Sequence, residues 1–241
     1  MKVTDAGRAM LGWALRSGVV SGTHDPLRLT KTIIINFQRG ELMTNRVFVY
    51  GSLSEGMIHF DKIAEAIQTS EKAWANGAAY QLRVGYPVIL NEPGQKIPGY
   101  VVELSSHEML LPMLDTFYGF SVLDPAKSLH LREKVEVVLE KGPTVDCWIY
   151  YLNPKKLPPT AQLISDGDWE SRIQGPKFTD QLTERQKTYI RRLGAATGRE
   201  VVPIDLPLYR ELMNLELIVD KGRRLALSKF GQEVYRYLGD A

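Results

Sequence analysis

The stretch Val47-Phe48-Val49-Tyr50-Gly51-Ser52-Leu53, with Gly56 shortly after it, decides how this chain folds. Its β-favouring residues stop at a Gly-Ser turn, and a helix-like composition follows. A strand that ends at a glycine gathers several backbone N–H groups in a small volume, and such a nest binds a carboxylate or an oxyanion. The alternative is a tight strand-to-helix turn in which glycine only supplies the backbone angles. Either interpretation predicts a strand followed by a turn here.

Further motifs follow this stretch in a fixed order. They comprise a Leu-Asp motif, a charged strand, an aromatic strand and an acidic segment before a tryptophan. In sequence these are Leu114-Asp115-Thr116-Phe117-Tyr118-Gly119, His130-Leu131-Arg132-Glu133-Lys134-Val135-Glu136-Val137, Cys147-Trp148-Ile149-Tyr150-Tyr151 and Ser165-Asp166-Gly167-Asp168-Trp169. Together with the first stretch, they make residues 46–173 resemble the gamma-glutamylcyclotransferase-like family. The resemblance implies an α+β fold, a small mixed β-barrel with helices packed outside it.

The resemblance also implies an activity. In such a reaction the free α-amine of a γ-glutamyl amide or dipeptide attacks its own δ-carbonyl, and 5-oxoproline and an amine are released. The implied substrate-binding residues are Tyr50, Gly51, Ser52 and Leu53, whose backbone N–H groups would hold the substrate and the developing oxyanion. No cofactor is implied, and the partner is a small γ-glutamyl-type ligand.

This chain departs from the family pattern at the catalytic position. The family's acid/base is the glutamate of Leu-Asp-x-x-Glu-Gly, and Tyr118 stands there instead. A tyrosine has a pKa near 10 and is a poor base at neutral pH. Because general acid–base catalysis is typically worth about 10²–10⁴-fold in rate, its loss predicts a feeble cyclotransferase at best. Tyr118 is therefore either a non-standard catalytic residue, a ligand-binding hydroxyl or an aromatic filler.

His130 is the second catalytic candidate, because it replaces a family tyrosine and histidine titrates near neutrality. The alternative is a partly buried strand histidine with a backbone hydrogen bond. Asp115 lies on the same motif as Tyr118. The alternative to a catalytic role for Asp115 is an exposed acid at a helix end or an acceptor of backbone N–H groups. Glu55 is expected as an exposed turn residue, and three other acids are left unranked, namely Glu92, Glu103 and Glu108.

Three hypotheses for function remain open. The first is a transferase or lyase that cyclises γ-glutamyl amides with an unusual acid/base. The second is a family member that has lost catalysis and binds a small amide or carboxylate ligand. The third is a regulator in which a barrel senses a ligand and the C-terminal residues contact DNA. The change to Tyr118 favours the second and third, while the retained Tyr50–Leu53 stretch keeps the first open.

Composition is that of an ordinary folded protein, with 44% hydrophobic and 24% charged residues among 241. The net charge of +2 gives no strong field for nucleic acid or anionic lipid. The single cysteine, Cys147, fits a reducing compartment, and no apolar run approaches the roughly 20 residues of a membrane span. We therefore expect a cytoplasmic protein. The four scattered histidines do not favour a metal site.

The domain plan has three parts: residues 1–42, a barrel domain over 43–175 and a C-terminal domain over 178–241. A helix is predicted over 1–16 and a strand over 30–37, and neither belongs to the family pattern. Gly40-Glu41 is compatible with codons that resemble a bacterial ribosome-binding site. We therefore hypothesise that Met43 is the natural start and that residues 1–42 are a mis-assigned leader.

The C-terminal domain is predicted to contain two helices, a β-hairpin and a last helix that Ser228 caps. This order resembles the winged-helix pattern. Five arginines are candidates for phosphate contacts, but acidic residues are nearly as frequent, so nucleic acid is not the favoured partner. A surface for homodimer formation or for covering the barrel is the favoured role. The arginines are Arg191, Arg192, Arg199, Arg223 and Arg224.

Within the barrel domain, apolar spacing predicts a helix over 60–70, strands over 73–83 and 86–90, and a turn over 91–95 at Pro93-Gly94. A strand over 97–104 and a helix from Ser106 to Phe117 follow. The last predicted elements are two strands, over 134–140 and 145–151, that form a hairpin.

Overall fold

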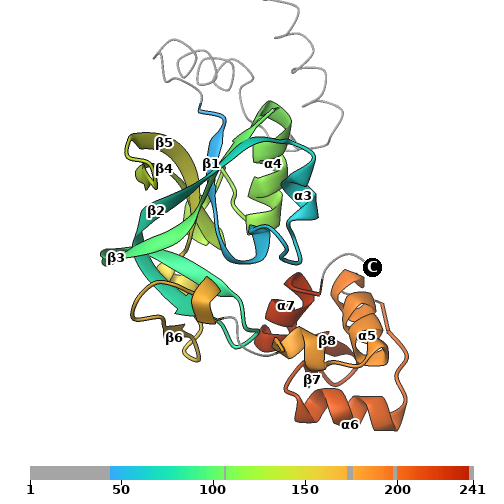
Figure 1. Cartoon of the computed structure of the whole chain (residues 1–241). Coiled ribbons are helices and arrows are strands. Elements are labelled where there is room, and N and C mark those ends of the chain that lie inside the picture. The colour runs from blue at the N-terminus through green and yellow to red at the C-terminus, as the bar shows by residue number, and fades with distance from the viewer. Residues whose placement is uncertain (1–43, 106, 173–175, 198–199, 239–241) are drawn as a thin grey trace, which may run out of the picture. The chain divides into compact units, whose positions relative to one another are not determined.

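The computed structural model describes residues 44–105, 107–172, 176–197 and 200–238 (Figure 1). The helix and strand predicted within residues 1–42 lie outside this described part. The strands are β1 (Arg46–Val49), β2 (Ile67–Gln81), β3 (Pro87–Leu104), β4 (His130–Leu139), β5 (Thr144–Leu152), β6 (Gln162–Leu163), β7 (Ile218–Asp220) and β8 (Leu225–Leu227). The α-helices are α3 (Asp61–Ala64), α4 (His107–Tyr118), α5 (Glu184–Ala195), α6 (Leu206–Asn214) and α7 (Lys229–Arg236).

Five strands close into a barrel. The hydrogen-bonded order is β3-β1-β5-β4-β2, and β2 pairs again with β3, while β6 adds to β2 outside this ring. β1 and β5 run parallel, and the other pairs that close the barrel are antiparallel. Helices α3 and α4 lie outside the barrel beside β1 (Figure 1). The predicted α+β barrel with outer helices is confirmed.

After Arg46, the sequence of β1 is apolar because both faces of the strand are buried there. Phe48 belongs to the cluster that fills the barrel, whereas Val47 and Val49 belong to a second cluster that includes Leu111 and Leu114 of α4. Alternate residues of a strand point to opposite faces, so one short run serves both cores. The turn at Gly51–Leu53 follows directly after this strand and Tyr50.

Two of the predicted elements are wrong. The helix predicted over 60–70 ends at Ala64, because Ile67 already pairs with Leu104 in the long ladder between β2 and β3. The turn predicted over 91–95 is part of β3. Gly77 pairs with Gln95 and Ala78 pairs with Leu90, so residues 91–94 form a bulge within the strand instead of reversing the chain.

The C-terminal segment, which we define as residues 176–238, has the predicted order of two helices, a hairpin and a helix. Thr183 caps α5 by accepting the backbone N–H of Gln186, and Gln186 returns a bond to Thr183. Ser228 caps α7 by accepting the N–H of Gly231, as predicted. These caps define helix starts that the sequence alone indicates.

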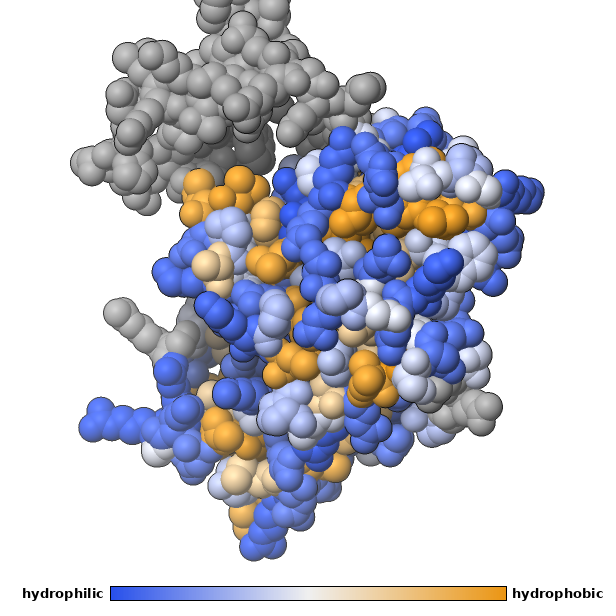
Figure 2. Space-filling model, turned by 90° about the vertical axis from the view of Figure 1, so that its left-hand side faces the viewer, coloured by the Kyte–Doolittle hydropathy of each residue, from blue (hydrophilic) through white to orange (hydrophobic). Residues whose placement is uncertain are grey.

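The surface that Figure 2 presents has hydrophobic residues in separate patches among hydrophilic ones. Several apolar side chains are strongly exposed, including Leu123 at 79% and Val122 at 66% of their full areas, both in the loop after α4. Among the described residues, no helix has the length and apolar character needed to cross a membrane.

Candidate functional site

A cavity of about 540 Å³ lies where the turn after β1, the end of α4, the start of β4 and the C-terminal segment meet. Its volume falls in the range typical of small-molecule sites. The barrel side contributes Tyr50, Ser52, His59, Lys62, Pro87, Val88, Phe117, Tyr118, Leu129 and His130 to its wall. The C-terminal segment contributes Arg191, Ala195, Tyr235, Arg236 and Tyr237.

The Tyr50–Leu53 turn reaches the cavity through two of its four residues. Tyr50 and Ser52 line the wall, and the Tyr50 hydroxyl accepts the backbone N–H of Ile89 at 2.8 Å. Leu53 points away into the outer core, where it is fully buried. Their proposed contacts with a ligand remain predictions.

Gly51 is required by the turn itself. Its φ angle is +63°, which is costly for a residue with a side chain. A Cβ at this position would lie 2.7 Å from Cγ of Pro87, the residue that begins β3. Gly51 therefore lets the turn pack directly against Pro87, which itself lines the cavity.

Tyr118 closes α4 and lies within a group of aromatic rings. Its ring stacks on Tyr150 with centroids 4.2 Å apart and planes 10° apart. Phe117 and His130 each meet it edge-on at 5.0 Å. Burial raises the pKa of the Tyr118 hydroxyl above its ordinary value, and the nearby Tyr237 adds to the rise. Tyr118 therefore remains protonated at neutral pH.

His130 begins β4 and is buried at 8% exposure. Its Nδ1 lies 2.7 Å from the carbonyl oxygen of Tyr118, so Nδ1–H donates to that carbonyl and leaves Nε2 without a proton in the neutral ring. Burial, together with a smaller effect of the positive charge of Arg236, lowers the pKa of His130 to about 4, although the backbone hydrogen bond opposes this change. This environment matches the alternative of a buried strand histidine with a backbone hydrogen bond, and it leaves the catalytic role untested.

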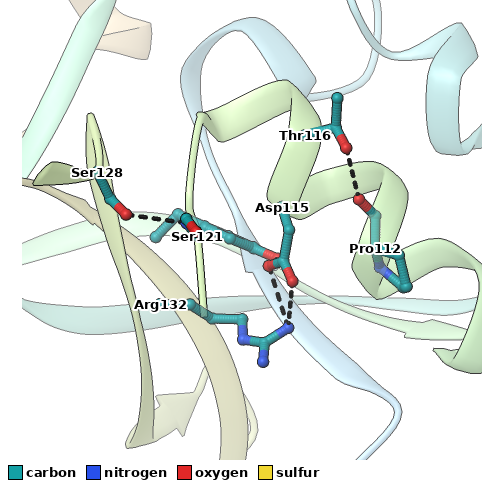
Figure 3. Close-up of polar contacts among 7 residues, drawn as sticks. Pro112, Asp115, Thr116, Ser121, Ser128 and Arg132 are labelled. Atoms are coloured by element: carbon teal, nitrogen blue, oxygen red, sulfur yellow. Dashed lines mark hydrogen bonds and ion pairs between the residues drawn. The ribbon is translucent and has the colours of Figure 1, made fainter. Parts of the chain in front are cut away.

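Asp115 is held in an ion pair behind Tyr118. Arg132 contacts both of its carboxylate oxygens from Nη1, at 2.8 and 3.0 Å (Figure 3), and the Tyr150 hydroxyl donates to it at 2.7 Å. The expectation of an exposed helix-end acid is wrong, because the side chain is only 15% exposed. Burial raises the pKa of Asp115, while Tyr150 and Arg132 counteract the rise. These bonds occupy the carboxylate, and Asp115 does not line the cavity.

The loop between α4 and β4 is closed by its own hydrogen bonds. The Ser121 N–H donates to Ser128 Oγ at 2.8 Å (Figure 3), and the Leu129 N–H donates to the Gly119 carbonyl at 2.9 Å. Asn153, the residue after β5, braces the loop by donating to the carbonyls of Ala126 and Ser128. These bonds hold Leu129 and His130 at the cavity wall.

No carboxylate side chain belongs to the cavity wall in the described part of the chain. Glu55 is exposed in the turn after β1, as expected. Glu92 lies beside the Tyr80 hydroxyl, and Glu103 pairs with Arg46 on the barrel. The described residues also contain no group of three or more His, Cys, Asp or Glu side chains placed to hold a metal ion. The wall is therefore aromatic and basic.

Sequence reasoning missed part of this wall. His59 is buried at 2% exposure and meets Phe117 edge-on at 4.9 Å. Tyr237 stacks on Tyr86 with centroids 4.6 Å apart and planes 7° apart. Nothing in the spacing of these residues indicates a shared cavity, because Tyr86 and Tyr237 meet only after the C-terminal segment folds against the barrel.

Comparison with known proteins places this barrel in a family. The family described as "Gamma-glutamyl cyclotransferase, AIG2-like" matches residues 47–171, and the chain belongs to it. A Drosophila melanogaster protein provisionally named a gamma-glutamylcyclotransferase is 28% identical over 154 residues, which cover 59% of this chain and 93% of that protein. The gamma-L-glutamyl-butirosin B gamma-glutamyl cyclotransferase of Niallia circulans is 30% identical over 117 residues, 48% of this chain and 71% of that enzyme.

Solved structures of the same kind are also similar. An AIG2-like protein from Mus musculus aligns with a TM-score of 0.39 at 19% identity, covering 51% of this chain and 86% of that one.

Proposed function

We propose that this protein binds a small γ-glutamyl-type ligand, such as a γ-glutamyl dipeptide or 5-oxoproline, and does not cyclise it at the rate that a carboxylate acid/base supplies. The observation that carries the proposal is the composition of the cavity wall. A pocket of suitable volume persists beside the Tyr50–Leu53 turn, yet the wall contains no carboxylate and presents Tyr118 where the family has its glutamate.

The reaction needs a base because the α-amine of the substrate arrives protonated. Tyr118 cannot accept that proton, since burial raises the pKa of its hydroxyl and keeps it protonated. Asp115 is committed to Arg132 and Tyr150 outside the cavity. A preorganised general base is therefore missing from the position where the family chemistry needs one.

His130 has a free Nε2 but too little basicity for this role. An α-ammonium has a pKa of about 8, whereas the pKa of His130 is lowered to about 4. Transfer of the proton is uphill by about four pKa units, or roughly 5 kcal/mol at 1.36 kcal/mol per unit. A neutral imidazole of this kind instead offers an acceptor to an ammonium or amide N–H of a bound ligand.

The test combines binding and turnover on the same purified protein. Isothermal calorimetry would measure the affinity for γ-glutamyl dipeptides, γ-glutamyl amines, glutathione and 5-oxoproline. Release of 5-oxoproline would be followed with each γ-glutamyl compound. We expect saturable binding of at least one compound. We also expect the variants Tyr118→Phe and His130→Asn to change the rate of 5-oxoproline release by less than about threefold, because neither side chain transfers a proton.

Two outcomes would contradict the proposal. Absence of binding by every compound would remove the ligand-binding function. Release of 5-oxoproline that falls by 10² or more in Tyr118→Phe or His130→Asn, with both variants folded, would identify an enzyme with an unusual acid/base.

A further inference from the structure

The C-terminal segment forms one side of the cavity, although it lies outside the residues that match the family. Arg191 and Ala195 come from α5, and Tyr235, Arg236 and Tyr237 come from the end of α7. The barrel thus has a pocket whose wall is completed by residues that the family domain itself does not supply. A property specific to this chain is therefore expected to depend on these residues.

The end of α7 is held against the turn between β2 and β3. The carboxylate of Glu233 accepts the backbone N–H of Val84 at 3.1 Å, a buried bond. Tyr237 stacks on Tyr86 of the same turn, and the guanidinium of Arg83 lies 4.1 Å from the ring centroid of Phe230. Polar, stacking and cation–π contacts therefore fix the position of α7 at the cavity.

The cavity wall is basic on this side. Arg191 and Arg236 lie on it, Lys62 lies on the barrel side, and none of the described residues in the wall is acidic. Arg191 donates to the carbonyl of Leu238, and both Arg191 and Lys62 have further partners. Arg236 has an exposed side chain, and within the described residues no ion pair joins it to a carboxylate. Arg236 is accordingly the cation best placed to meet an anionic ligand group.

Arg236 lines the same cavity as His130 and Tyr118. Its charge is close enough to His130 to act on that ring, and His130 contacts Tyr118, which stands in the catalytic position. The Tyr50–Leu53 turn is assigned to the glutamyl half of the ligand. In that placement, the half derived from the amine would extend past Tyr118 and His130 toward α7.

We infer that Arg236 is a specificity-determining residue that binds a carboxylate on the amine-derived half of the ligand. The preferred ligands are γ-glutamyl amino acids and peptides, whose second half carries a free carboxylate, over γ-glutamyl amines, which lack one. This inference rests on the proposed function. A guanidinium suits the role because its planar donors match a carboxylate in a bidentate geometry.

The experiment uses a matched pair of ligands that differ only in that carboxylate, γ-glutamylalanine and γ-glutamylethylamide. Calorimetry on the full chain would compare the wild type, Arg236→Gln and the control Arg223→Gln. Arg223 is an exposed cation between β7 and β8 that does not line the cavity. We expect the wild type to bind γ-glutamylalanine about tenfold or more tightly than the ethylamide, as a hydrogen-bonded charge pair allows.

In Arg236→Gln we expect the affinity for γ-glutamylalanine to fall about tenfold and that for the ethylamide to change less than twofold, with Arg223→Gln like the wild type. Equal losses for both ligands in Arg236→Gln, or a wild type without preference, would overturn the inference and leave the proposed function standing. If neither ligand nor 5-oxoproline bound to the wild type, the proposed function would fail and the inference with it. Circular dichroism would establish that each variant is folded.

Discussion

The two barrel-derived sides of the cavity differ in how closely they keep the family pattern. On one side, Tyr50-Gly51-Ser52-Leu53 retains the sequence and forms a tight turn packed on Pro87. On the other side, Tyr118 stands where the family resemblance implies a glutamate, and its ring stacks on Tyr150, while the carboxylate of Asp115 is paired with Arg132. In the proposed function, the first side binds the ligand, and the second side presents aromatic rings where a proton-transfer group would be needed.

This difference separates two tasks that an enzyme combines. A turn that holds a ligand through backbone groups needs a defined backbone conformation, which Gly51 provides. Proton transfer needs a titratable group with a pKa near the working pH. In the proposed function, a tyrosine at residue 118 lacks the second property and leaves the first in place.

Introducing a carboxylate at residue 118 should have the largest effect. In Tyr118→Glu the new side chain would lie in a largely buried, aromatic environment, which raises the pKa of a carboxyl toward neutrality. We expect 5-oxoproline release from γ-glutamyl compounds to increase by about 10²–10⁴-fold, the usual contribution of general acid–base catalysis. The measurement is a time course of 5-oxoproline formation across a pH series.

Tyr118→Gln is the matched control, since it has the shape of glutamate without its titratable group. It should bind ligand as Tyr118→Glu does and remain as slow as the wild type. Equal rates in the two variants, with both folded, would mean that residue 118 is not the missing acid/base.

A methyl group at Gly51 should damage the preserved side. In Gly51→Ala the positive φ and the close approach to Pro87 act together, so we expect a stability loss of about 2–4 kcal/mol and at least tenfold weaker ligand binding. Gly56→Ala is the control, because Gly56 also has a positive φ of +75° but nothing within 4 Å of the added carbon. It should cost about 1–2 kcal/mol and leave affinity nearly unchanged.

Urea denaturation and calorimetry would give both quantities for these variants. Similar affinity losses in the two would show that the packing on Pro87 is irrelevant to binding, and that the two sides of the cavity are less distinct than their sequences indicate.

The parts of this molecule that sequence predicts are those in which local pattern and tertiary packing agree. The turn after β1, the hairpin of β4 and β5 and the caps of α5 and α7 are of this kind. The helix predicted over 60–70 failed because Ile67 joins a ladder with Leu104, a partner 37 residues away along the chain. The Pro93-Gly94 sequence is typical of a turn. In the structure it lies in a bulge of β3, because the register between β2 and β3 shifts at this point.

For the candidate site, Tyr50, Ser52, Tyr118 and His130 line one cavity, and their roles in binding or catalysis remain predictions. The residues of α7 were not predicted as part of the site. The spacing of apolar residues in a helix indicates which face is buried, but it does not indicate which element packs against that face. The contact between Tyr86 and Tyr237 depends on the docking of the C-terminal segment, which no local pattern encodes.

The altered side of the cavity should also set how stability responds to acid, with a smaller effect than the two above. The pKa of His130 is lowered to about 4 in the folded protein against about 6.5 in the unfolded chain. Between these values the unfolded state binds more protons, so stability is full above about pH 6.5 and falls as the pH drops toward 4. The expected contribution of His130 to this loss is about 2 kcal/mol between pH 7 and pH 5.

Urea denaturation of the wild type and of His130→Gln at both pH values isolates this contribution, because the other titrating groups are common to the two proteins. The variant should lose about 2 kcal/mol less than the wild type over the interval. Adding Arg236→Gln to the wild type should reduce the loss slightly, since the charge of Arg236 helps to keep His130 neutral. Equal losses of stability in the wild type and His130→Gln would mean that His130 has an ordinary pKa in the folded state. His130 would then be basic enough for a catalytic role on this side of the cavity.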